Sequence, residues 1–168
     1  MDEKGLIMEK EAERFNSLYR FLKRQETMYG IALRELNMGK KMSHWMWYIF
    51  PQIRGLAKSR KAFVFGIKDI NEAKAYLAHP LLGPRLIDCC KAILKHKNKT
   101  AKEILGNIDA VKLRSSMTLF AAVSEENSLF HKVLEFFYDG ETDPLTEGFI
   151  SGRMLDTTPL KYLSDFID

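Results

Sequence analysis

The chain has 168 residues, of which 46% are hydrophobic and 29% charged, and its formal net charge is +4. This length suits one domain with a sizeable core, and the composition excludes a disordered or fibrous protein. The apolar stretches are too short to cross a bilayer and the N-terminus carries neither a secretory signal nor a transit peptide, so we expect a cytoplasmic protein with no membrane partner.

Short motifs that hold metals or cofactors are missing from the sequence. The two cysteines, Cys89 and Cys90, are adjacent, so they neither staple distant segments nor form a spaced pair of metal ligands. Phosphate-binding glycine loops, dinucleotide fingerprints and HExxH motifs are also lacking. We therefore expect reduced, buried thiols, no metal site and no cofactor.

Apolar residues recur every three or four positions in the first part of the chain, which predicts two helices. The first is expected from Glu9 to Lys23. Thr27 is a candidate cap for the second, which covers residues 28–36 and ends at Gly39.

An aromatic segment follows at residues 43–52. Ser43 is a candidate N-cap for a short helix over residues 44–50, and Pro51 ends that helix. A buried strand is the alternative, because periodicity does not separate the two structures at this length. Residues 62–67 are β-branched and aromatic, and they predict one short extended segment.

Capping residues mark the helices that come later in the chain. These helices are expected over residues 72–78, 80–94, 100–105, 109–121 and 128–138 and from Pro144 onward, with candidate caps at Asn71, Thr100, Asp109, Asn127 and Asp143. The sequence thus predicts an all-α fold, a compact multi-helix bundle. Residues 1–150 form the domain, and residues 151–168 form a C-terminal extension that docks on it.

Charge is distributed unevenly along the chain. Between Glu35 and Asp69 every charged residue is basic, whereas the segment from Glu125 to Glu147 is mainly acidic. The basic segment can meet an anion such as phosphate or nucleic acid, or the two segments can face each other or water. We favour the second interpretation, because charge runs usually form solvated faces.

The aromatic segment is the first candidate binding region. Trp45 and Trp47 offer flat faces on which a ring can stack, and His44 and Gln52 can orient that ring; Ser43 is also counted among the binding residues. His44 is the candidate catalytic residue, since it can exchange a proton near neutral pH. The alternative is that the aromatic residues belong to the core and that His44 donates to a carbonyl.

The second candidate region lies on the helix predicted after Asp109. Lys112 and Ser116 share one helical face, Ser115 lies beside them, and Arg114 lines the neighbouring face. Together these cations and hydroxyls resemble an anion cradle, because Arg grips phosphate in a bidentate manner. The alternative is that the serines bond back to their own helix and that Arg114 pairs with a carboxylate.

Three segments, SHWMWYIFPQ, AYLAHPLLGPRL and KLRSSMTLFAAV, resemble in order and spacing the family called domain of unknown function 1810. The resemblance runs from about Phe15 to Phe149. It implies a small, mostly α-helical intracellular protein of uncharacterised function and supplies no catalytic residues. Some relatives carry the label calpastatin, but that inhibitor is disordered and this chain has the composition of a folded domain.

These observations support two hypotheses. In the first, the SHWMW and KLRSS segments form a pocket that binds a phosphorylated or nucleotide-like small molecule, with hydrolase or transferase activity as an extension of that role. In the second, the chain is a non-catalytic regulatory module whose basic surface meets an acidic partner, nucleic acid included. The sequence decides neither enzyme status nor oligomeric state.

Overall fold

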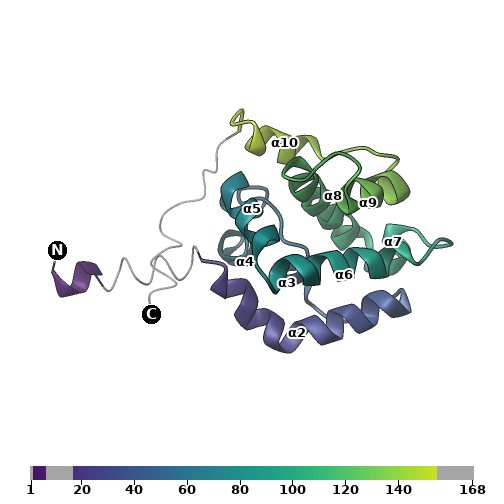
Figure 1. Ribbon diagram of the computed structural model, residues 1–168, viewed down its shortest axis with the longest axis horizontal. Coiled ribbons are helices and arrows are strands. Elements are labelled where there is room, and N and C mark those ends of the chain that lie inside the picture. Colours follow the sequence, from purple (N-terminus) through teal and green to yellow (C-terminus); the bar gives the residue numbers. More distant parts are fainter. Residues whose placement is uncertain (1, 7–16, 155–168) are drawn as a thin grey trace.

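Helix α6 (Leu82–Leu94) lies at the centre of the molecule, between α2 (Tyr19–Met38) on one side and α8 (Asn107–Ala122) with α9 (Leu129–Tyr138) on the other (Figure 1). This computed structural model describes residues 2–6 and 17–154. Helix α6 packs against α2, α9 and α5 (Ile70–Ala78), and α8 packs against α9 and α5. The all-α prediction is confirmed.

Shorter helices complete the bundle. Helix α3 (Met46–Ile49) packs against α2, α7 (Ala101–Leu105) and α10 (Pro144–Ile150) pack against α8, and α4 (Arg60–Val64) precedes α5. Within the described part of the chain, strand pairing is limited to one parallel bridge between Ile53 and Ile67. None of the helices described there combines the length and the apolar content that crossing a bilayer requires.

One apolar core joins these helices, and aromatic rings connect its layers. The ring of Tyr76 on α5 meets Phe21 of α2 edge-on at 5.3 Å and lies 5.4 Å from Phe120 of α8. All three side chains are fully buried. Contacts of this kind between large rings stabilise a core beyond the area that they bury.

Both cysteines lie in this core on α6, as predicted. They are free and fully buried. Burial raises the pKa of Cys89 to about 12 and raises the pKa of Cys90 well above its ordinary value. The thiols are therefore protonated packing groups.

The structure corrects the expectation of two helices at the start. Residues 19–38 form the single helix α2, and Thr27 lies inside it, where its hydroxyl bonds back to the carbonyl of Arg24. The apolar stripe is continuous across this position, so the helix continues and the capping preference of Thr27 has no effect. The part of the predicted first helix before Ser17 lies outside the described residues.

The expected extended segment at residues 62–67 is also corrected. Residues 60–64 form α4, because the hydroxyl of Ser59 caps this helix by accepting from the N–H of Ala62. Only Ile67 keeps extended pairing, through the bridge to Ile53. β-branched and aromatic residues favour a strand only where a partner strand exists.

Several predicted caps shift by one to three positions. Thr100 forms a full capping box with Glu103, and Asp143 caps α10, as expected. The observed caps of α5, α8 and α9 are instead Asp69, Gly106 and Ser128. Of the predicted C-terminal extension, residues 151–154 are described and the rest lies outside the described residues.

Candidate functional site

A cavity of about 380 Å³ opens between α8, α10 and the loop that follows α3. Its lining comes from both candidate regions and from the segments around them. The lining residues are Trp47, Gln52, Ile53, Leu56, Ala57, Ala62, Gly66, Ile108, Val111, Lys112, Ser115, Asp143 and Leu145.

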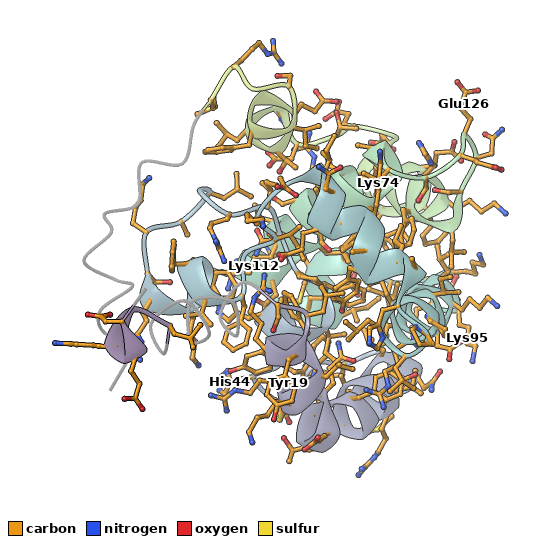
Figure 2. The ribbon with its side chains drawn as sticks, turned by 60° about the vertical axis from the view of Figure 1, so that its left-hand side comes forward. Tyr19, His44, Lys74, Lys95, Lys112 and Glu126 are labelled. Carbon is orange, nitrogen blue, oxygen red and sulfur yellow. The ribbon has the colours of Figure 1, made fainter. Side chains whose placement is uncertain are left out.

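Trp47 and Lys112 bring the two candidate regions together in this cavity. The ammonium nitrogen of Lys112 lies 4.3 Å from the centroid of the Trp47 ring, over its face. Such a contact between a cation and an aromatic ring is attractive, and it holds a long, mobile side chain in place. Figure 2 labels Lys112 near the centre of the view.

Asp109 links Lys112 to a second lysine. One of its carboxylate oxygens lies 2.8 Å from the ammonium of Lys41, and the other lies 3.5 Å from that of Lys112. Two cations thus share one carboxylate, and the closer contact belongs to Lys41. The group carries one excess positive charge, which favours an anion beside Lys112.

Asp143 is the carboxylate of the cavity, and its two oxygens differ. Oδ2 accepts hydrogen bonds from the hydroxyl of Ser115 and from the backbone N–H and hydroxyl of Thr146. Oδ1 accepts none from the residues that the structure describes. The carboxylate is therefore held firmly through one oxygen, and the other remains available as an acceptor.

Gln52 is held by its backbone, while its side chain makes no hydrogen bond to the described residues. Its carbonyl accepts from the N–H of Ile67, and the N–H of Arg54 donates to the carbonyl of Ile67. The residue is 8% exposed, and its carboxamide makes no hydrogen bond to any residue in the described ranges. Because the carboxamide also lines the cavity, its donors and its acceptor remain available to a ligand or to water.

The rest of the lining is mainly apolar and extends to the surface. Ile108 and Val111 on α8 and Leu145 on α10 are 73%, 65% and 53% exposed. Small-molecule sites commonly combine apolar walls with a few convergent polar groups. This cavity therefore suits a ligand with an apolar, planar body and an anionic group.

Trp45 and Ser43 lie away from the cavity, against Glu35 of α2. The indole N–H of Trp45, the hydroxyl of Ser43 and the backbone N–H groups of Met42 and Ser43 all donate to the Glu35 carboxylate. Burial favours the protonated acid, but these hydrogen bonds outweigh it and lower the pKa of Glu35 to about 2. Trp45 is fully buried, so it has no free face for a ligand.

The other three candidates also lie outside the lining. His44 is exposed, and Figure 2 shows it at the edge of the molecule near Tyr19. Arg114 donates to the backbone carbonyls of Glu141 and Thr142 and thereby holds the turn before α10. Ser116 is fully buried among the helices.

Sequence reasoning missed part of the lining, although a signal was present. Ile108, Val111, Lys112 and Ser115 follow the spacing of one helical face, so two apolar residues accompany the two polar candidates. Asp143 was recognised as a cap, but its place in the cavity depends on how α10 packs on α8. Local sequence does not determine that packing.

Other parts of the structure bear on metals and on the basic segment. Among the described residues, no three His, Cys, Asp or Glu side chains are grouped so that they could hold a metal ion. Lys41 and Arg54 of the basic segment are internal, since Lys41 pairs with Asp109 and Arg54 donates to the carbonyl of Phe63. The basic segment is thus only partly a surface feature.

Comparison with known proteins identifies the class to which this fold belongs. A family model described as "Protein of unknown function (DUF1810)" matches residues 15–150, and the chain belongs to this family. It is similar to the crystal structure of the conserved hypothetical protein Rv1873 from Mycobacterium tuberculosis, with 42% identity and a TM-score of 0.78. The match covers 80% of this chain and 96% of that one. No protein of curated function matches.

Proposed function

We propose that the cavity binds a small molecule with a planar ring and an anionic group, that is, a phosphorylated or nucleotide-like compound. The observation that carries this proposal is the placement of Trp47 and Lys112 in one cavity, with the cation 4.3 Å from the ring centroid. An aromatic face and a positive charge side by side suit a ring that carries an anion.

The size and exposure of the site support this proposal. The volume of about 380 Å³ falls within the range of roughly 300–1,000 Å³ typical of small-molecule sites. The side chain of Lys112 is 23% exposed, whereas Gln52 is 8% exposed. The ring of the ligand therefore enters toward Gln52, and its anionic group remains near the mouth beside Lys112.

The binding residues proposed from the sequence are accordingly narrowed to Trp47, Gln52, Lys112 and Ser115. A hydrolase or transferase step would need a base close to the ligand. Asp143 lines the cavity and is better placed for that role than His44, which is exposed outside it.

Thermal stabilisation by ring phosphates tests the proposal. Phenyl phosphate and nucleoside monophosphates are expected to stabilise the parent chain, by about 2.7 kcal/mol at a concentration one hundred times the dissociation constant. Lys112→Ala is expected to weaken binding at least about tenfold, because removal of a partly buried charge partner costs more than about 1.4 kcal/mol. Lys74→Ala is the matched control, since Lys74 is exposed on α5 and does not line the cavity (Figure 2).

Two results would contradict the proposal. One is the absence of stabilisation by every ring phosphate, and the other is equal weakening by Lys112→Ala and Lys74→Ala. Equal weakening, together with affinity for nucleic acid that falls steeply with salt, would favour the alternative of a basic binding surface.

A further inference from the structure

Two polar groups in the cavity lining have hydrogen-bonding capacity that the described residues leave unused. The Gln52 carboxamide and the Oδ1 atom of Asp143 make no hydrogen bonds to residues in the part of the chain that the structure describes. The hydroxyl of Ser115, by contrast, already donates to Oδ2 of Asp143. The Gln52 carboxamide and Asp143 Oδ1 can therefore bond a ligand in the cavity.

The chemistry of a carboxamide defines the ligand group that complements it. A Gln side chain offers N–H donors and a carbonyl acceptor in one plane, so it pairs with a neighbouring acceptor and donor on a flat ring. Protein carboxamides recognise the edges of nucleobases in this way. An alkyl or phenyl ring would leave both groups of Gln52 unsatisfied, at a cost of about 1–3 kcal/mol for each buried group.

The surroundings of Gln52 keep this group in place. The Ile53–Ile67 bridge and the hydrogen bond from the Ile67 N–H to the Gln52 carbonyl fix the backbone at this residue, and Ala62 and Gly66 also line the cavity. A Cβ atom added at Gly66 would lie 2.6 Å from the carbonyl oxygen of Ala62 and 2.8 Å from Arg54, so this wall approaches closely and admits no larger residue.

We infer that the ring of the cavity ligand carries an adjacent hydrogen-bond donor and acceptor, as a nucleobase does, and that Gln52 recognises this edge. The inference rests on the proposed function and makes it specific. Trp47 contacts the face of the ring, Gln52 bonds its edge, and Lys112 binds the phosphate.

The test compares ligands that differ in one ring N–H. Uridine and inosine monophosphates are titrated beside their ring-N-methylated derivatives, which keep the ring and the phosphate but lose the donor. The parent chain is expected to bind at least one unmodified nucleotide about tenfold or more tightly than its methylated form. In Gln52→Leu, which has no acceptor for this N–H, the preference is expected to disappear, whereas Gln52→Glu keeps an acceptor oxygen and is expected to retain the preference.

Phenyl phosphate distinguishes failure of the Gln52 inference from failure of the proposed function, because its ring carries no hydrogen-bonding groups for Gln52 to recognise. If phenyl phosphate binds in a manner that depends on Lys112 while each nucleotide binds no better than its methylated form, the proposed function stands and the role of Gln52 is overturned. A preference that survives in Gln52→Leu also overturns it. If phenyl phosphate and the nucleotides all fail to bind, both proposals fall.

Discussion

Trp45 and Trp47 belong to one aromatic segment, yet they occupy opposite kinds of surroundings. Each ring has a lysine over its face, Lys41 for Trp45 and Lys112 for Trp47, and both lysines contact Asp109. Trp45 is fully buried and its N–H is bonded to Glu35, whereas Trp47 is partly exposed and opens on the cavity.

The difference shows that two tryptophans of one aromatic segment can serve different roles, one structural and one proposed for binding. On the Trp45 side the polar atoms that contact the ring are paired with one another, which is typical of a structural anchor. On the Trp47 side the carboxamide of Gln52 has no partner among the described residues, which is typical of a binding site. The number of satisfied hydrogen bonds therefore distinguishes the structural Trp45 side from the proposed binding site at Trp47, although both sides contain the same type of residue.

Replacement of the two tryptophans breaks the comparison most directly. Trp45→Ala is expected to lower the free energy of unfolding by about 3–5 kcal/mol, because it leaves a large cavity in the core. Trp47→Ala is expected to lower it by only about 1 kcal/mol, since that ring is partly exposed. Urea unfolding of the two variants measures both values, and equal losses would show that the two rings do not differ in role.

Glu35→Gln tests the anchor through its charge. The folded pKa of about 2 lies below the ordinary value of 4.5, so the charged carboxylate contributes stability above about pH 4.5 and loses it as the pH falls toward 2. Because the variant removes the charged acceptor of four hydrogen bonds, Glu35→Gln is expected to lose about 1–3 kcal/mol at neutral pH.

The pH dependence supplies the control for this variant. The difference between the parent chain and Glu35→Gln is expected to shrink between about pH 4.5 and pH 2, as measured by urea unfolding at several pH values. Glu26→Gln, at an exposed position on the same helix, is expected to change stability by less than about 0.5 kcal/mol throughout. A constant difference for Glu35→Gln across this range would show that its charge contributes nothing.

Gln52→Leu is expected to have the smallest effect on stability, and it tests whether the Trp47 side differs from the structural side. An apolar side chain of similar size removes a carboxamide that makes no hydrogen bond to the described residues, so stability is expected to stay unchanged or to rise by up to about 1 kcal/mol. Gln25 offers the matched contrast, since it is also buried and its carboxamide donates to the carbonyl of Tyr48 and to the hydroxyl of Tyr76.

Gln25→Leu is therefore expected to lose about 2 kcal/mol, because it strands two buried groups. Differential scanning calorimetry of the two variants measures the contrast. A clear loss of stability in Gln52→Leu would mean that its carboxamide supports the fold, and the binding role would lose its physical basis.

Periodic patterns in the sequence predicted most of the helices and the all-α class, because an apolar stripe is a local property. The errors arose where a residue with a local capping preference instead formed a different interaction in the fold. Thr27 has the chemistry of a cap but lies within a continuous stripe, and Ser43 bonds the Glu35 carboxylate while α3 begins at Met46 without a side-chain cap.

The candidate site was harder to predict than the fold. The sequence identified Trp47 and Lys112 as candidates, but the distance between them depends on how α3 and α8 pack, which spacing along the chain does not reveal. The division between Trp45 and Trp47 likewise depends on Glu35, a residue of a different helix. Long-range contacts such as these are set by the whole fold.

The buried thiols of Cys89 and Cys90 give the protein a built-in reporter of its own opening. A thiol reacts with alkylating reagents as the thiolate, and burial both hides these sulfur atoms and raises their pKa. Alkylation by iodoacetamide can therefore proceed only in molecules whose α6 has separated from its neighbours. The labelling rate measures the free energy of that opening under native conditions, without denaturant.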